Sequence, residues 1–220
     1  MHQSIKNIID LNNKVKQKIE ELNFSNYTPE IIAISKTFTM TEILPLIEYG
    51  HQHFGENKVQ EALSKWTEVK TKKKDIKLHM VGRLQSNKVK QAVKIFDYIH
   101  SVDSIKLAKK ISDEQVKQNK KIKLFLQVNI GDESQKNGVP ISEIENLVNE
   151  CKNISLNVIG LMCLPPLSEN SSQFFSIIKK KNDELNFQDL SLGMSNDYME
   201  ALIYKSTFIR IGTKIFGKRS

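Results

Sequence analysis

Lys36 is the residue of this sequence whose surroundings most favour covalent chemistry. It ends the segment IIAISK, the most apolar of the strands that the sequence predicts. A lysine amine that is desolvated in such a place can lose its proton near neutral pH and attack an aldehyde. The alternative is a structural lysine whose stem crosses the rim of the fold while its ammonium reaches water. The position at a strand end leaves both interpretations open.

Two segments near the carboxyl terminus have the composition of a phosphate-binding site. The first, GMSND, contains Ser195, which we predict to cap a short helix. The second, RIGT, combines Arg210 with Gly212, where the backbone can approach an anion closely, and with the hydroxyl of Thr213. Backbone N–H groups at a helix start bind anions. The same residues also suit an ordinary helix cap and an ordinary tight turn.

Short apolar segments alternate with helical patterns along the chain, and these elements must position the residues above. Ile144, Leu147, Val148 and Cys151, for example, recur with helical spacing. A further amphipathic helix is predicted over 3–22, and a helix or helix-like turn follows each predicted strand. The predicted strands are 31–35, 52–54, 77–81, 98–102, 122–129, 155–160, 190–192 and 207–210.

Eight strands in 220 residues are typical of a compact (β/α)8 barrel. We therefore predict an α/β fold of the TIM-barrel type with an extra N-terminal helix, formed by residues 1–220 as a single domain. An open doubly wound sheet is the alternative, but no G-x-G-x-x-G motif follows the first strand. The carboxyl ends of barrel strands gather at one end. A lysine and a phosphate cradle at that end match one ligand with an aldehyde and a phosphate, pyridoxal 5'-phosphate (PLP).

Capping patterns predict three helix starts along the chain. They are Ser142 with Glu145, Thr39 with Glu42, and Asn57 with Gln60. Glu56 either orients Lys36 or lies at a helix N-terminus. The polar loop with Gln85, Asn87 and Lys88 either meets an anionic ligand or caps the next helix.

The histidines have no metal-site spacing. His51 and His53 alternate along a predicted strand and so share a face, but no third ligand is at hand. Packing in the core or at the rim is favoured for both, and for His79. Cys151 and Cys163 show neither disulfide nor zinc spacing. We predict no metal site.

Composition narrows the classes of function. The net charge is +8, but the lysine clusters are not interleaved with the aromatic residues of a single-strand binding groove. Anionic small ligands are favoured over nucleic acid. The chain has no apolar run long enough to span a bilayer, and its first residues lack the apolar block of a signal peptide. A cytoplasmic protein is the expectation.

Several long segments resemble the pyridoxal phosphate homeostasis protein family, formerly described as proline-synthetase-associated. The resemblance extends over essentially the whole chain. Its most specific segments are AISKTF at 33–38, HFGENKVQEALSKW at 53–66, HMVGRLQSNKVK at 79–90, LSLGMSNDYMEAL at 190–202 and STFIRIGTKIFGKR at 206–219. The family is similar to the barrel domain of the bacterial alanine racemases without their second, β-rich domain.

The resemblance implies that Lys36 forms the internal aldimine with PLP. The other implied contacts are Ser195, Gly212 and Thr213 at the phosphate, Arg210 beside the pyridine nitrogen, and Asn57 near the ring face or its 3-hydroxyl side. The chain departs from the family pattern at Lys205, where glycine is frequent, and at Arg83, in a variable loop position. Neither departure touches an implied contact.

The resemblance also implies a PLP carrier for intracellular homeostasis. Such a protein stores, buffers and delivers PLP, passes it to PLP-dependent apo-enzymes, affects amino-acid and vitamin B6 pools, and is expected to be a monomer. One alternative is a PLP-dependent amino-acid racemase with Lys36 as base, and another is a basic barrel that binds RNA or another macromolecule. A racemase needs two opposed proton-transfer groups, and no tyrosine of the chain stands in an obvious opposing loop.

Arg210 favours the carrier further. A guanidinium only donates hydrogen bonds, so the pyridine nitrogen beside it stays unprotonated and the ring is a weaker electron sink. We therefore expect a non-catalytic protein. A trace racemase activity with Lys36 as its one base is compatible with this expectation.

Overall fold

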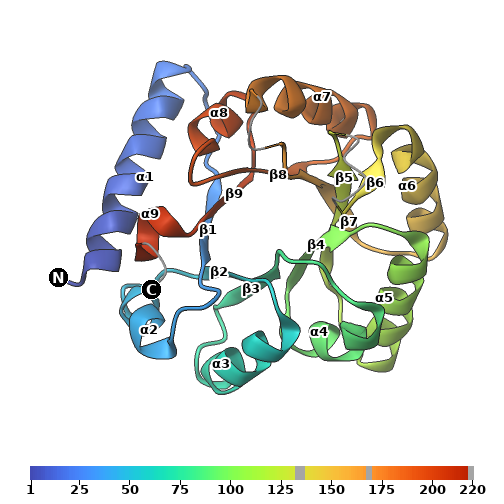
Figure 1. Ribbon diagram of the computed structural model, residues 1–220, viewed down its shortest axis with the longest axis horizontal. Helices are drawn as coiled ribbons and strands as arrows, with labels where there is room; N and C mark the ends of the chain where they lie inside the picture. Colours follow the sequence, from blue (N-terminus) through green and yellow to red (C-terminus); the bar gives the residue numbers. More distant parts are fainter. Residues whose placement is uncertain (132–136, 167–169, 218–220) are drawn as a thin grey trace.

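The computed structural model describes residues 1–131, 137–166 and 170–217, which form a closed barrel of eight parallel strands inside a ring of helices (Figure 1). Neighbouring strands pair in the order β4-β3-β2-β1-β9-β8-β7-β5, and β4 pairs with β5 to close the barrel. The predicted (β/α)8 barrel is confirmed, and the open sheet is excluded. The strands are β1 (Glu30–Ile34), β2 (His53–Glu56), β3 (Lys77–Met80), β4 (Tyr98–Val102), β5 (Lys123–Asn129), β7 (Val158–Cys163), β8 (Asp189–Met194) and β9 (Phe208–Ile211); the short β6 (Val139–Pro140) pairs with β5.

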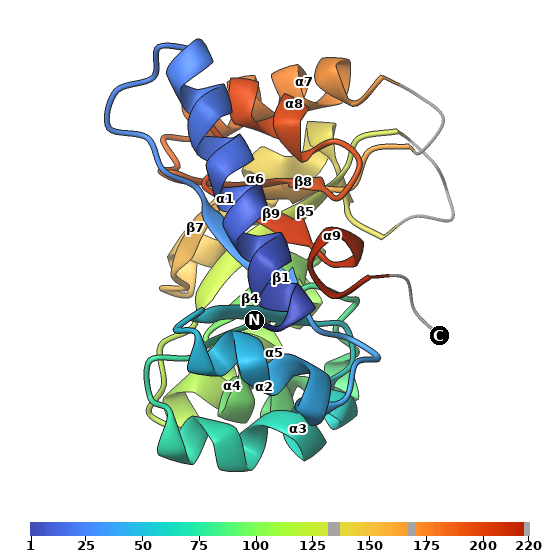
Figure 2. The ribbon, with the colours of Figure 1, turned by 90° about the vertical axis from the view of Figure 1, so that its left-hand side faces the viewer.

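Helices cover the outside of the strands. The predicted N-terminal helix is confirmed as α1, which runs along the outside of the barrel beside α8 and α9 (Figure 2). The helices are α1 (Gln3–Glu21), α2 (Met40–Glu48), α3 (Val59–Lys72), α4 (Val89–Ile95), α5 (Ile105–Lys117), α6 (Ile144–Asn153), α7 (Ser171–Glu184), α8 (Tyr198–Ile203) and α9 (Thr213–Phe216), with 3-10 turns η1 (Ser86–Lys88) and η2 (Ile141–Glu143). No helix in the described part of the chain is long and apolar enough to cross a membrane.

β7, the sixth strand of the barrel, lies three residues later than the sequence predicts. Ser155 has a φ of 54°, in the left-handed region, and its N–H bonds the carbonyl of Lys152. Residues 154–157 therefore end α6 and turn the chain, and the strand begins only at Val158. Residues 155–157 (Ser-Leu-Asn) directly precede an apolar segment, so the composition of the whole stretch reads as one strand.

Of the three predicted helix starts, one is confirmed. Thr39 and Glu42 form the capping box of α2, and the Thr39 N–H donates to Glu42 Oε2 over 2.7 Å. The start at Ser142 is wrong, because η2 precedes α6 and α6 begins at Ile144. The start at Asn57 is also wrong, because Lys58 is the N-cap residue of α3.

The barrel encloses a core of its own, separate from the larger core between strands and helices. Its buried apolar residues are Ile32, Ile34, Tyr98, Phe125, Met162 and Phe208. The rings of His79 and His100 lie among them, since His79 stacks on Tyr98 with centroids 4.2 Å apart and His100 stacks on Phe125 at 4.4 Å. The barrel interior is therefore partly polar.

Candidate functional site

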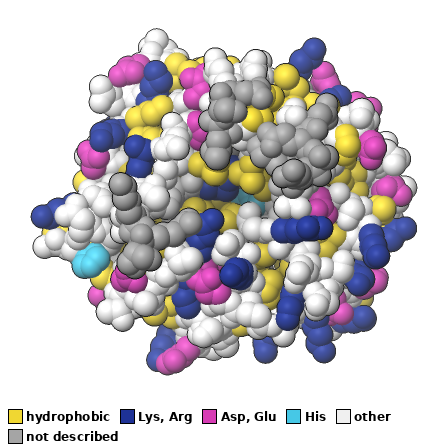
Figure 3. All heavy atoms as spheres, viewed as in Figure 1, with side chains coloured by type: hydrophobic (Ala, Val, Ile, Leu, Met, Phe, Trp, Pro, Cys, Tyr) yellow, Lys and Arg dark blue, Asp and Glu magenta, His cyan; other side chains and the backbone are white. Residues whose placement is uncertain are grey.

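A cavity of about 800 Å³ lies at the carboxyl-terminal end of the barrel, a size typical of small-ligand sites. In the space-filling view, this face is hollowed near its centre, where hydrophobic and basic side chains border the opening (Figure 3). Five of the six predicted site residues line the cavity: Lys36, Ser195, Arg210, Gly212 and Thr213. Its apolar walls come from Ile34, Val81, Leu164, Pro165, Pro166 and Met194.

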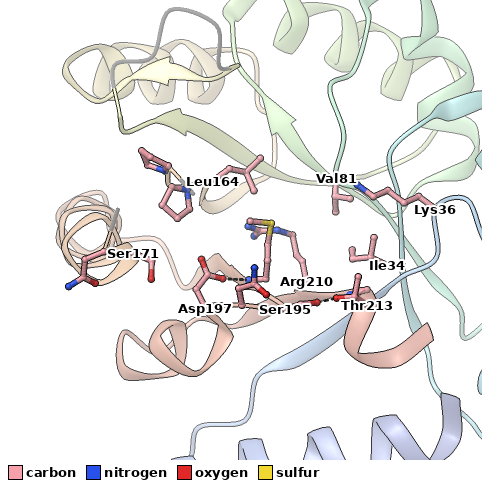
Figure 4. Close-up of a pocket in the computed structure, with 15 residues that line it drawn as sticks. Ile34, Lys36, Val81, Leu164, Ser171, Ser195, Asp197, Arg210 and Thr213 are labelled. Atoms are coloured by element: carbon pink, nitrogen blue, oxygen red, sulfur yellow. Dashed lines mark hydrogen bonds between the residues drawn. The ribbon is translucent and has the colours of Figure 1, made fainter. Parts of the chain in front are cut away.

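Lys36 lies in a turn that directly follows β1, two residues beyond the end of the strand. Its half-buried side chain extends across the cavity toward Val81 (Figure 4). The next residue, Thr37, has a φ of 70°, which is strained for a β-branched residue. The Thr37 N–H donates to Glu61 Oε1 over 2.6 Å. The turn that carries the lysine is thus held by neighbouring side chains.

Lys65 is the centre of the contacts that hold this turn. Its Nζ donates to the carbonyl of Ser35 over 2.9 Å and to that of Phe38 over 3.3 Å, and it forms a 2.7 Å ion pair with Glu56 Oε1. The fully buried Glu56 also accepts from the Ser35 hydroxyl over 2.7 Å. Glu56 therefore supports the Lys36 turn instead of capping α3.

The two loops predicted to hold a phosphate meet at one side of the cavity. Ser195 and Thr213 lie close together there, with Arg210 beside them (Figure 4). The Gly212 N–H donates to the Ser195 hydroxyl over 3.4 Å, which joins the loop after β8 to the loop after β9. Thr213 is the first residue of α9, so N–H groups of that turn lack intrahelical acceptors.

The prediction that Ser195 caps a helix is wrong. Asp197 is the N-cap residue of α8, and its Oδ1 accepts from the Met194 N–H over 2.6 Å. The Ser195 hydroxyl instead faces the cavity, where it is available to an anion.

Arg210 lies at the floor of the cavity and is buried, with 4% of its surface exposed. Its Nη1 donates to Ser191 Oγ over 2.6 Å and its Nη2 to the carbonyl of Cys163 over 3.0 Å. Burial lowers the pKa of the guanidinium and raises the pKa of the Cys163 thiol to about 12. A buried cation is thus held here by neutral acceptors, with its donors directed by the protein.

Asn57 does not line the main cavity. It lies at a neighbouring cavity of about 370 Å³, together with Lys58, Arg83, Gln85 and Lys88. Its Oδ1 is buried and has no hydrogen-bond partner among the described residues. A Cβ atom on Gly82 would lie 2.4 Å from the Asn57 carbonyl oxygen, so only glycine lets the loop after β3 approach it. The predicted role of Asn57 at the cofactor ring stays a prediction.

Several cavity residues were not anticipated by the sequence analysis. Asn170 and Ser171 at the start of α7, the Leu164–Pro166 segment after β7 and Asp197 all line the cavity. For the residues between β7 and α7, the available signal was their position after the sixth barrel strand, since functional residues of barrels follow the strands. The misplaced end of that strand concealed it.

The comparisons with known proteins agree with this geometry. The family described as "Alanine racemase, N-terminal domain" matches residues 10–220. The chain is 31% identical to the pyridoxal phosphate homeostasis protein of Escherichia coli (strain K12), over 97% of this chain and 95% of that protein. The chain therefore belongs to the pyridoxal phosphate homeostasis protein family. A relative of the same name from Aquifex aeolicus is 32% identical over 94% of both chains.

Solved structures of the family show the same barrel. PipY of Synechococcus elongatus with PLP bound has a TM-score of 0.80 and 32% identity, covering 92% of this chain and 100% of PipY. Alanine racemase of Clostridium difficile has a TM-score of 0.70 at 14% identity, covering 93% of this chain and 55% of the racemase. The second likeness is one of fold alone.

In this family member the predicted pairing of His51 with His53 on one face is wrong. The strand begins at His53, whose ring contacts His79, Tyr98 and Phe208 inside the barrel. The ring of His51 packs instead edge-on against Phe54, 5.2 Å away. In the described part of the chain no group of three His, Cys, Asp or Glu could hold a metal ion.

Because of the buried histidines, we expect the free energy of unfolding to decrease in mild acid. Burial is the largest cause that lowers the pKa of His51 and of His53 to about 4, whereas unfolding returns both to about 6.5. The unfolded chain then binds more protons between pH 6.5 and 4, so the stability present above pH 6.5 is lost as the pH falls. We expect the free energy of unfolding to decrease by about 1 kcal/mol per histidine between pH 7 and 5.5.

Urea denaturation at the two pH values measures this effect, and His51→Gln should remove about 1 kcal/mol of the decrease. An unfolding free energy that is flat between pH 7 and 5.5 would contradict the prediction.

Proposed function

We propose that this protein binds PLP covalently through Lys36 and serves in the intracellular homeostasis of PLP by storing, buffering and delivering it. The observation that carries the proposal is the convergence of Lys36 with Ser195, Gly212, Thr213 and Arg210 on one cavity. An amine from the first strand, hydroxyls from the last two loops and a buried guanidinium fit the aldehyde, phosphate and pyridine nitrogen of one ligand. The PLP-bound relative PipY supports the proposal.

Each residue has a distinct task. When bound, PLP supplies an aldehyde that condenses with a lysine amine and releases water. Lys36 provides that amine from a turn that Lys65 and Glu61 hold in place. The hydroxyls of Ser195 and Thr213 donate to the phosphate, and Gly212 leaves room for it. Arg210 donates to the pyridine nitrogen and cannot accept from it, so it keeps that nitrogen unprotonated.

We further propose that the protein is a carrier and not a dedicated enzyme. Among the described residues that line the cavity there is no tyrosine, histidine or cysteine to act as a second proton-transfer group opposite Lys36. The one carboxylate there, Asp197, already accepts from the Met194 N–H over 2.6 Å. Racemisation needs two such groups on opposite faces of the substrate.

The proposed partners are PLP and the apo-enzymes that would receive it. We propose that residues 1–220 act as a single PLP-binding domain in the cytoplasm and that Asn57 lies beside the cofactor ring. The monomeric state stays a prediction.

Uptake and transfer of PLP test the proposal together. We expect the purified protein to bind one equivalent of PLP with a visible absorption band, and borohydride to fix reduced PLP on the peptide that contains Lys36. The loaded protein should activate a PLP-dependent apo-enzyme and show no interconversion of L- and D-alanine beyond a trace. No band and no modified peptide would overturn PLP binding, and rapid racemisation would overturn the carrier.

A further inference from the structure

A continuous chain of hydrogen bonds runs through the barrel interior and ends at Arg210. His53 Nδ1 lies 2.9 Å from His79 Nε2, His79 Nδ1 lies 2.9 Å from His100 Nε2, and His100 Nδ1 lies 2.9 Å from Ser191 Oγ. Ser191 Oγ in turn accepts from Arg210 over 2.6 Å. At the other end, His53 Nε2 faces Glu30 Oε2 at 3.6 Å. Five strands contribute the chain: β1, β2, β3, β4 and β8, with Arg210 on β9.

The chain spans the barrel from one end toward the other. Glu30 and His53 are the first residues of β1 and β2, at the amino-terminal end. Arg210 lines the cavity at the carboxyl-terminal end. Glu30 is the exposed terminus, with 58% of its side chain accessible, whereas His79, His100 and Ser191 have no exposed surface. A charge on the amino-terminal rim is thereby connected to the floor of the proposed cofactor site.

The three rings are neutral at neutral pH. Burial lowers the pKa of His79 and of His100 well below the usual value, and His53 is held to a pKa of about 4 by burial and by the nearby Lys77 and Lys123, against an opposing effect of Asp97. A neutral imidazole has one N–H and one acceptor nitrogen. Each hydrogen bond of the chain therefore has one donor and one acceptor. The ring N–H groups must then all point the same way, either outward to Glu30 or inward to Arg210.

The two ends select the outward direction. Arg210 can only donate, so Ser191 accepts from it and has its own hydrogen left for His100 Nδ1. The negative charge of Glu30, 3.6 Å from His53 Nε2, favours a proton on that nitrogen. Both conditions are met when all three rings carry the proton on Nε2. In the opposite direction a lone pair of His53 would face a carboxylate, and Ser191 would have to accept from both Arg210 and His100.

We propose that His53, His79 and His100 form a directional relay by which the charge at Glu30 sets the hydrogen bonding of Ser191 and Arg210 at the floor of the cavity. In the wild type the acceptor side of every ring faces Arg210. If the relay reverses, every ring N–H points toward the cavity, and the positive potential there increases. Its effect on the cofactor rests on the proposed function, but the relay itself is a property of the protein alone.

The first test uses the cofactor-free protein and the charge reversal Glu30→Lys. Histidine labelled with 15N reports which ring nitrogen is protonated. We expect Nε2–H at His53, His79 and His100 in the wild type and Nδ1–H at all three in the variant, because an ammonium repels Nε2–H. Asp75→Lys, which reverses the charge of another exposed residue near the amino-terminal end of the barrel, is the control and should leave the tautomers as in the wild type.

Mixed tautomers in the wild type, or unchanged His79 and His100 in Glu30→Lys, would overturn the relay. Glu30 and Asp75 are both exposed, so we expect both variants to fold, and urea denaturation checks this.

The second test measures whether the relay acts on the ligand. Pyridoxine 5'-phosphate has the ring and phosphate of PLP but no aldehyde, so Lys36 chemistry does not enter. We expect Glu30→Lys to bind it about fivefold more tightly than Asp75→Lys does, at the lower end of couplings between distinct sites. Equal affinities would overturn the coupling to the ligand. Absence of binding in every variant would refute the proposed function, and the tautomers would then decide the relay alone.

Discussion

Lys36→Ala should abolish the absorption band of the lysine–PLP linkage and the borohydride-stable modification of the protein. The reason is that the covalent linkage needs an amine at this position of the cavity. The contacts of Ser195, Thr213 and Arg210 persist in the variant, so PLP still binds through its phosphate and ring. We expect the affinity for PLP to fall by about 100-fold, which corresponds to about 2.7 kcal/mol.

Two control variants separate the linkage from the charge. Lys36→Arg keeps a cation at the site but has no amine that condenses with an aldehyde, so it should also lack the band. Lys58→Ala removes a lysine from the neighbouring cavity and should keep the band. Since Lys36 is half-buried in a turn outside β1, the alanine variant should unfold at the same urea concentration as the wild type. A band that persists in Lys36→Ala would place the linkage at another lysine.

The barrel could be predicted from the sequence because the residues that indicate each strand and each helix are neighbours in the sequence. Each apolar segment and each helical pattern is written in consecutive residues, and their strict alternation leaves few folds. The boundaries depended on single backbone conformations instead. Ser155 with its positive φ moved one strand by three residues, and nothing in its residue type announces that conformation.

The site could be predicted in part for a similar reason. Lys36, Ser195, Gly212 and Thr213 follow strands and Arg210 is the last residue but one of β9, and a barrel brings such positions together. The histidine relay could not be predicted, because its members are far apart in the sequence and meet only when the barrel closes. His79, read by itself, is a histidine in an apolar segment, and its two ring partners come from two other strands.

Lys65→Met should be among the most destabilising substitutions outside the apolar core. The Lys65 side chain is 12% exposed and its partner Glu56 is fully buried. Removing the ammonium leaves a buried carboxylate without a counter-ion, which costs about 3–5 kcal/mol. The variant also frees the carbonyls of Ser35 and Phe38. The strained turn at Thr37 then loses its support, and we expect less covalent attachment of PLP at Lys36 as well.

Urea denaturation of three further variants separates the causes. Lys72→Met removes an exposed ion pair with Glu68 on the same helix and should change the free energy of unfolding by no more than about 0.5 kcal/mol. Glu56→Gln keeps the acceptor for the Ser35 hydroxyl and for Trp66 Nε1. The double variant Lys65→Met with Glu56→Gln should therefore be more stable than Lys65→Met alone, which shows the coupling of the two charges directly. If both lysine variants lost the same small stability, Lys65 would be only a surface contact, and the position of Lys36 would have to depend on β1 itself.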